Sequence, residues 1–239
     1  MPKTFLKAEW KKLLMINYPV DKKLLDPYIP YKTELDLWNN TCYVSLIGFM
    51  FLNTKVKKLK IPFHINFEEV NLRFYVKHKD MITNEWKRGV VFIKEIVSKP
   101  ALTFIANSLY KENYETLPTS HKWIIENDRL SIEYSWEKSN SHNSIKIVTG
   151  TELFDIENGS EEEFITEHYW GYTRINENMT SEYGVEHPRW KIYKTLDYEI
   201  NVNFENTYPK EFGFLDSVNP ASVFLAEGSE IEVKEGREI

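Results

Sequence analysis

The residues Glu69-Val70-Asn71-Leu72-Arg73-Phe74-Tyr75-Val76 decide the fold. Polar and apolar side chains alternate along this stretch with a period of two, which is the period of a β-strand. One face therefore carries Glu69, Asn71, Arg73 and Tyr75, and the other face is apolar. On an open sheet the polar face is wetted by solvent. In a closed or strongly curved sheet it lines a pocket, where an arginine beside a glutamate can bind and orient a carboxylate.

The surrounding sequence predicts many strands and few helices. Strand patterns cover residues 13–18, 35–38, 41–51, 69–77, 90–97, 123–125, 130–136, 191–204 and 223–233. Asn39-Asn40 and residues 126–129 are typical hairpin turns. Asp21, Ser98 and Ser160 are each suited to cap a short helix. The pattern predicts an α+β, mainly β protein with a large curved or closed antiparallel sheet and two or three short helices.

Length and composition indicate one soluble domain over residues 1–239, since no linker or repeat divides the chain. The only cysteine, Cys42, cannot form an internal disulfide bond, and the N-terminus carries no secretory signal pattern. No apolar run reaches the length of a membrane span. We therefore expect a cytoplasmic protein without a membrane partner.

Metal and cofactor motifs are missing from the sequence. It has no Gly-rich phosphate loop or dinucleotide fingerprint, and its six histidines do not follow the spacing of metal ligands. We expect no metal and no cofactor.

Lys94 is the first candidate for covalent chemistry. With strict alternation it shares a strand face with Val90, Phe92 and Ile96. A desolvated lysine can act as an amine nucleophile that forms a Schiff base. Alternatively, its stem packs in the sheet while its ammonium group reaches water.

The motif His187-Pro188-Arg189-Trp190 precedes a predicted strand. It can place an imidazole and an indole N–H at the mouth of a pocket. The alternative is a hydrogen-bonded structural histidine.

The net charge of −6 is unevenly distributed, because residues 1–120 carry 19 Lys/Arg against 12 Asp/Glu. The densest basic stretch contains Lys55, Lys57, Lys58 and Lys60. It could bind an anionic partner or protect a strand edge from pairing. No aromatic residues alternate with these lysines, so we expect no nucleic-acid partner.

Several of these motifs together resemble the YqjF-like family of bacterial proteins of unknown function. The resemblance covers about residues 9–235 and depends on the following segments: Glu9-Trp10-x-x-Leu13-Leu14, Val20-Asp21, residues 69–76, Arg88-Gly89-Val90-Val91-Phe92, Glu167-His168-Tyr169 and residues 187–190. It implies an acetoacetate decarboxylase-like barrel around a central pocket, with Glu69, Asn71 and Arg73 facing the cavity.

The resemblance also implies where a decarboxylase keeps its reactive lysine, in the segment corresponding to residues 106–114. The paired lysines of that enzyme are not evident here. Lys111 is the nearest candidate, but Glu112 beside it favours the charged form of an amine over the nucleophilic form.

The leading hypothesis is a protein that binds a small anionic or carbonyl-bearing molecule. Its site would contain Glu69, Asn71 and Arg73, with Tyr114, His187 and Trp190 near the rim. One alternative is a lyase of the decarboxylase or aldolase type that uses Lys94 or Lys111. Another is a protein-interaction module that uses the basic stretch. The sequence does not specify the ligand or the oligomeric state.

Overall fold

The computed structural model describes residues 3–105, 107–108 and 111–239. Its helices are short: α1 (Lys22–Leu25), α2 (Pro100–Ile105), α3 (Glu161–Thr166), α4 (Phe204–Thr207) and the 3-10 helices η1 (Asp26–Tyr28) and η3 (Lys210–Ser217). In the described ranges, none of the helices is long and apolar enough to cross a membrane.

The strands join into one 14-stranded sheet within the described ranges. They are β1 (Thr4–Val20), β2 (Thr33–Leu35), β3 (Cys42–Val56), β4 (Phe67–Lys79), β5 (Trp86–Val97), β6 (Tyr114–Thr116), β7 (Thr119–Glu126), β8 (Arg129–Lys138), β9 (Ser141–Asp155), β10 (Trp170–Asn176), β11 (Met179–Glu186), β12 (Lys191–Asn201), β13 (Ser222–Lys234) and β14 (Arg237–Glu238). The mainly β prediction is therefore confirmed.

Seven of these strands close into a ring in the order β11-β10-β5-β4-β3-β1-β13, because β11 also pairs with β13. Most neighbours are antiparallel, but β10 runs parallel to β5, and so does β6. The large sheet predicted as antiparallel is therefore mixed, with parallel pairing at these two places. A Cβ atom at Gly89 would lie only 2.4 Å from the carbonyl oxygen of Trp170, so the glycine permits the close β5–β10 contact.

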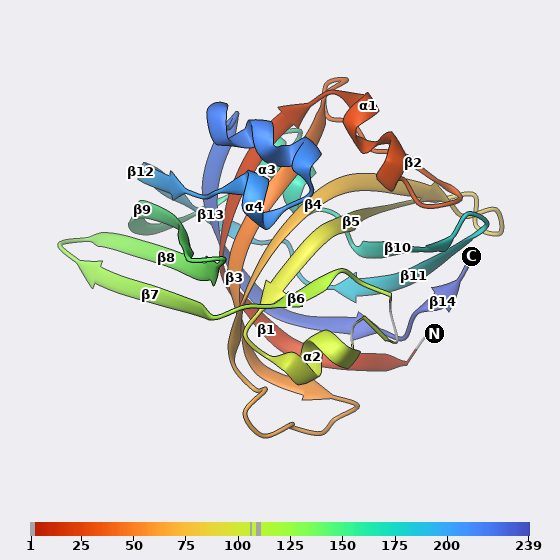
Figure 1. Cartoon of the computed structure of the whole chain (residues 1–239), viewed down its shortest axis with the longest axis horizontal. Coiled ribbons are helices and arrows are strands. Elements are labelled where there is room, and N and C mark those ends of the chain that lie inside the picture. The colour runs from red at the N-terminus through yellow and green to blue at the C-terminus, as the bar shows by residue number, and fades with distance from the viewer. Residues whose placement is uncertain (1–2, 106, 109–110) are drawn as a thin grey trace.

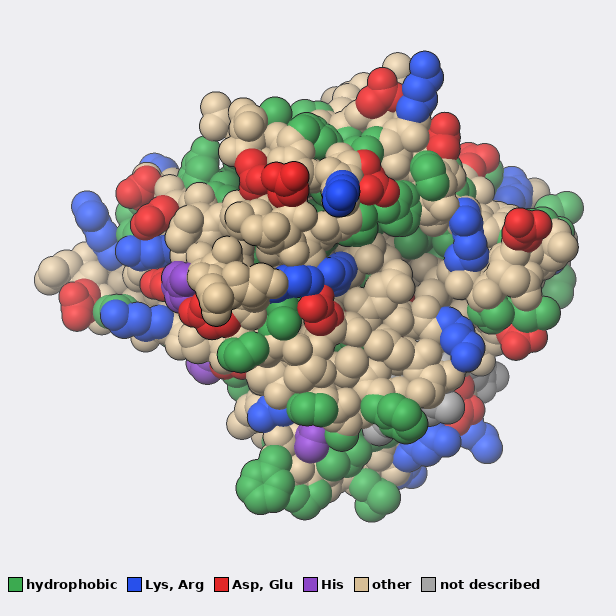
Figure 2. Space-filling view, in the orientation of Figure 1, with side chains coloured by type: hydrophobic (Ala, Val, Ile, Leu, Met, Phe, Trp, Pro, Cys, Tyr) green, Lys and Arg blue, Asp and Glu red, His purple; other side chains and the backbone are tan. Residues whose placement is uncertain are grey.

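Beyond β13, the sheet continues outside the ring through β12, β9, β8 and β7. Figure 1 shows β7 and β8 as a long hairpin projecting to the left of the ring. The surface seen in Figure 2 carries acidic and basic side chains interspersed, and the coloured residues form no broad patch of one sign.

The alternation along residues 69–76 is confirmed by two separate apolar cores. Val70, Leu72 and Phe74 belong to an outer core shared with β8, β9, α4 and η3. Tyr75 belongs to an inner core with aromatic residues of β3 and α3. The polar face of β4 is therefore directed into the ring and away from solvent.

A β-bulge at Ile93 changes the face pattern on β5. Leu72 lies opposite Lys94, but Arg73 lies opposite Phe92, so Ile93 is an extra residue. The inner core contains Val90, Val97 and the partly buried Phe92, whereas Ile93 and Ile96 belong to the outer core. The expectation that Val90, Phe92, Lys94 and Ile96 share one face was wrong, because the bulge reverses the alternation.

The predicted local signals are largely confirmed. The Asp21 side chain accepts a hydrogen bond from the Lys23 backbone N–H at 2.9 Å, and Ser160 accepts one from Glu163 at 3.2 Å. Asn39 and Asn40 both have positive φ, as the predicted turn requires. The predicted hairpin would pair the segment before this turn with β3. Instead β2 pairs with β4, since β1 and β4 already occupy both edges of β3.

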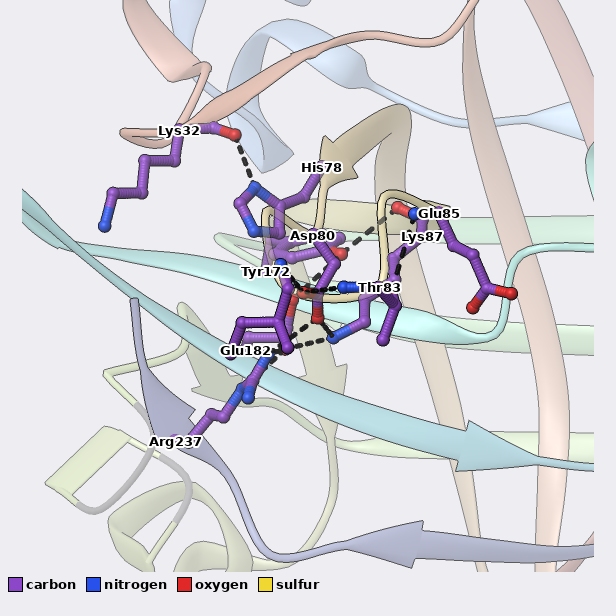
Figure 3. A network of polar contacts seen from close by, with 10 residues as sticks. Lys32, His78, Asp80, Thr83, Glu85, Lys87, Tyr172, Glu182 and Arg237 are labelled. Carbon is purple, nitrogen blue, oxygen red and sulfur yellow. Dashed lines mark hydrogen bonds and ion pairs between the residues drawn. The ribbon is translucent and has the colours of Figure 1, made fainter.

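A buried ion network attaches the C-terminal strand to the ring (Figure 3). The Lys87 ammonium lies 2.6 Å from Asp80 Oδ2 and 3.2 Å from Glu182 Oε1. The Arg237 guanidinium donates to the same Glu182 oxygen at 2.8 Å. The Glu182 side chain is fully buried, so two cations depend on one inaccessible carboxylate.

We expect Glu182→Ala to lower the free energy of unfolding by about 3 kcal/mol, because it removes the fully buried carboxylate that Lys87 and Arg237 share and leaves both cations with Asp80 alone. Urea denaturation measures the loss. Asp155→Ala is the matched control, since Asp155 pairs with Lys191 on the surface and should contribute less than about 1 kcal/mol. Equal losses in the two variants would contradict a structural role for the network.

Candidate ligand-binding site

The ring encloses a cavity of about 160 Å³, which every strand of the ring helps to line. A cavity of about 150 Å³ is large enough to hold a benzene molecule. Most of the lining is apolar, and its largest members are the aromatic side chains of Trp10, Phe51, Phe67, Phe92, Trp170 and Trp190. The site therefore suits a small molecule with an apolar body.

Three buried glutamates line this cavity: Glu69, Glu95 and Glu112, with exposed fractions of 3%, 2% and 8%. Glu69 accepts hydrogen bonds from Asn71 Nδ2 at 2.9 Å and from the Tyr114 hydroxyl at 3.0 Å. We call these three glutamates the acidic cluster.

The other two glutamates differ in how well they are satisfied. Glu112 Oε1 accepts from the hydroxyls of Thr173 at 2.7 Å and Tyr183 at 3.1 Å. Glu95 Oε2 is buried and has no hydrogen-bond partner among the described residues. The acidic cluster thus contains one buried oxygen atom, Glu95 Oε2, that can accept a further hydrogen bond.

Burial changes the protonation of the cluster. It raises the pKa of Glu69 and of Glu112 to about 7 each. It also raises the pKa of Glu95 well above its ordinary value, and the neighbouring carboxylates Glu112 and Glu69 raise it further. Three carboxylates in one apolar cavity cannot all ionise cheaply, so the cluster retains protons at neutral pH.

Arg73 supplies the positive charge. It is the only lysine or arginine among the described residues that line the cavity. Its Nε is buried without a hydrogen-bond partner, and within the described ranges no carboxylate forms an ion pair with it. Its guanidinium lies 5.7 Å from the centre of the Tyr75 ring. Arg73 is therefore a partly buried cation that forms no ion pair with a carboxylate in the described ranges.

His168 lies two residues after the end of α3 and is held by a carboxylate. Its Nε2 is 3.2 Å from Asp36 Oδ2, and Asp36 also accepts from Arg88 Nε at 2.6 Å. Burial opposes ionisation of Asp36, but the hydrogen bonds from His168 and Arg88 lower its pKa to about 2. Because Asp36 is ionised, the shared proton is on Nε2, and His168 Nδ1 is a buried acceptor without a described partner.

The two cavity histidines are uncharged at neutral pH. Burial lowers the pKa of His168 to about 4. Burial also lowers the pKa of His187, which stacks on Trp190 with ring centres 4.1 Å apart. Arg73 is therefore the only formal cation on the described cavity wall.

The structure brings most of the predicted site residues together. Glu69, Arg73, Tyr114, His187 and Trp190 line the cavity. Asn71 is buried between Glu69 and Arg73 on β4 and positions the Glu69 carboxylate.

Sequence reasoning missed Glu95, Glu112, His168 and Tyr183 as cavity residues. Glu95 was concealed by the bulge at Ile93, which no sequence pattern indicated. Glu112 lies in a segment without regular secondary structure, so no periodicity assigned it to a face. His168 was visible only as part of the Glu167-His168-Tyr169 motif.

Neither candidate lysine reaches the cavity. The bulge directs Lys94 away from the cavity. Its ammonium group donates to Glu115 Oε2 at 2.9 Å and to the Thr207 carbonyl oxygen at 2.6 Å. Burial lowers the pKa of Lys94, and the ion pair with Glu115 opposes that shift. Lys111 is exposed. All lysines of the chain lie in the described ranges, and none lines the cavity.

Two further sequence features lie outside the cavity. Lys57 and Lys58 occupy the exposed turn that follows β3, so the basic stretch does not contribute to the cavity wall. In the described part of the chain, no three His, Cys, Asp or Glu side chains are arranged to hold a metal ion.

The acidic cluster predicts how stability depends on pH. Its glutamates have higher pKa values in the folded protein than in the unfolded chain, so folding takes up protons and stability falls as the pH rises. The buried neutral histidines change the pH dependence of stability only below about pH 6.5, the ordinary pKa of histidine. Between pH 6.5 and 8.5 we therefore expect the free energy of unfolding to fall by up to about 1.4 kcal/mol per pH unit for each titrating glutamate. The thermal midpoint should fall with it, and thermal denaturation at several pH values measures the slope.

Glu95→Gln should flatten this dependence, because the amide stays neutral at every pH. The exposed substitution Glu152→Gln is the control and should keep the wild-type slope. A slope that Glu95→Gln leaves unchanged would show that the cluster is not responsible.

Solved structures with the same fold include enzymes. Acetoacetate decarboxylase from Legionella pneumophila aligns with 100% of this chain and 88% of its own, at a TM-score of 0.66 and 11% identity. An acetoacetate decarboxylase-like enzyme from Sphingomonas wittichii RW1 aligns over 99% and 94%, with a TM-score of 0.66 and 9% identity. The enduracididine biosynthesis enzyme MppR complexed with pyruvate covers 100% and 91%, with a TM-score of 0.64 and 10% identity. The expected acetoacetate decarboxylase-like fold is confirmed.

Sequence comparison confirms the resemblance to YqjF. The uncharacterized protein YqjF of Bacillus subtilis (strain 168) is 25% identical over 204 residues, which are 83% of this chain and 78% of YqjF. The family model DUF2071, described as an uncharacterized conserved protein, matches residues 7–230. The chain therefore belongs to the DUF2071 family of uncharacterized conserved proteins.

Proposed function

We propose that this protein binds a small molecule with an apolar body and a carboxylate head group in the ring cavity. The observation that carries the proposal is Arg73, a cavity-lining arginine without a protein counter-ion. Arg73 is partly buried and its Nε has no hydrogen-bond partner among the described residues, so an anionic ligand would supply the acceptor that this donor lacks. The planar guanidinium can also bind a carboxylate through two parallel hydrogen bonds.

The remainder of the cavity supports a ligand of modest size. Aromatic side chains surround it, and Trp190 is held in place because its Nε1 donates to Ser229 at 2.9 Å. The Asp36–His168 pair leaves one buried acceptor, which can receive a hydroxyl or N–H group. A few fixed polar groups in an apolar pocket are typical of small-molecule sites.

The names of the structural relatives favour the same ligand class. The Legionella pneumophila enzyme is named for the decarboxylation of acetoacetate, and MppR was solved in complex with pyruvate. Both molecules carry a carboxylate beside or near a ketone. We therefore propose short oxo acids and simple short carboxylates as the class bound here.

Arg73→Ala should weaken the binding of pyruvate and butyrate at least tenfold, because it removes the only cation of the described cavity wall. Ligand-induced stabilisation in a thermal-shift titration measures this effect. Arg129→Ala, at an exposed position on β8, is the matched control and should bind as the wild type does. Unchanged affinity in Arg73→Ala would refute the proposed site.

Covalent chemistry through a lysine gives a separate test. Because no lysine lines the cavity, treatment with borohydride and pyruvate should leave the intact mass of the protein unchanged. An adduct mapped to Lys94 or Lys111 would instead favour a lyase of the Schiff-base type.

A further inference from the structure

We infer that the acidic cluster binds a cationic amine or amidine group of the same ligand whose carboxylate binds Arg73. This inference depends on the proposed function and narrows it to small amino acids and related zwitterions. The acidic cluster and Arg73 then serve as the two polar ends of one site.

The register of β4 and β5 separates these ends. Glu69 and Arg73 lie on the same face of β4, four residues apart, which places their Cα atoms about 13 Å from each other. Glu95 lies opposite Asn71, midway between them. One wall of the cavity therefore runs from a carboxylate end to a guanidinium end.

Carboxyl groups outnumber cations on the described cavity wall. The described lining holds three glutamates and a single arginine. All three carboxyl groups are buried, so water cannot stabilise their negative charges. Either protons or a bound cation must neutralise the excess acid.

Glu95 provides an independent indication of a ligand. Its Oε2 is buried and lacks a hydrogen-bond donor among the described residues. The titratable groups near it are Glu69 on β4, Glu112 in the segment before β6, Tyr114 on β6 and Tyr183 on β11. A hydrogen bond from Tyr114 opposes the rise in the Glu95 pKa, but none of these groups is a cation. An ammonium group would supply a donor to Oε2 and a positive charge.

An organic cation fits better than a metal ion. In the described ranges no three carboxylate or imidazole groups are grouped closely enough to hold a metal. The lining around the cluster is also largely aromatic, and aromatic faces attract organic ammonium groups.

Three probes of equal chain length test the inference: butyrate, butylamine and 4-aminobutyrate. Their affinities are measured by isothermal titration calorimetry at pH 7 in two buffers with different ionisation enthalpies. We expect 4-aminobutyrate to bind at least tenfold more tightly than butyrate. Both amine-bearing probes should release protons, because the ammonium group displaces protons from the cluster.

Variants assign each end of the site. Glu95→Gln should weaken butylamine and 4-aminobutyrate at least tenfold and leave butyrate unchanged, whereas Arg73→Ala should weaken butyrate and leave butylamine unchanged. Glu152→Gln, exposed on β9, is the control for the amide substitution. A thermal midpoint of Glu95→Gln at or above that of the wild type shows that the variant is folded.

The outcomes separate the two proposals. If butyrate binds through Arg73 but butylamine does not bind at millimolar concentration, the carboxylate site stands and the cation site is wrong. Amine binding without proton release, or amine binding that Glu95→Gln leaves unchanged, also overturns the inference. If butylamine binds through Glu95 and butyrate does not bind, the proposed function fails and the ligand is a simple amine.

Discussion

The pairing of β11 with β13 is the contact on which the remaining architecture depends. Val185 and Glu186 lie opposite Val233 and Glu232, and these few residues convert an open sheet into a ring. A side chain on the concave face of an open sheet reaches water. Inside the closed ring the same side chain must be satisfied by the protein or by a ligand. The polar face of β4 acquires its chemical properties from this closure.

The bulge at Ile93 decides which charge enters the ring. Without the extra residue, strict alternation directs Lys94 toward the cavity and Glu95 away from it. With it, Lys94 is directed outward to Glu115, and Glu95 joins two other buried glutamates. The inserted residue thus keeps the Lys94 amine out of this cavity. Bulges are frequent next to functional sites for this reason, because they redirect single side chains.

Two kinds of buried charge coexist in the molecule. In the network of Lys87, Glu182 and Arg237, each charge has a partner, and the network attaches β14 to the ring (Figure 3). In the cavity, Arg73 and Glu95 retain unsatisfied atoms. Natural proteins satisfy most of their buried polar atoms, and an unsatisfied atom that lines a cavity can be satisfied by a ligand or by water.

The sequence by itself determined the local features. The alternation at residues 69–76, the Asp21 and Ser160 helix caps and the Asn39-Asn40 turn depend on side chains close in sequence, and all appear in the structure. Such features need no distant contact, because a strand period or a cap is a property of a few neighbouring residues. The resemblance of several short motifs also indicated the fold.

Only the tertiary structure decided which of these residues meet. Glu69 on β4, Glu95 on β5 and Glu112 before β6 become neighbours through strand pairing and ring closure, and the bulge at Ile93 sets their faces. Their shifted pKa values follow from burial, which depends on the whole ring and not on any segment. Contacts between residues far apart in the chain leave no periodic signal in the sequence. A one-residue bulge leaves none either, since the two halves of β5 each alternate normally.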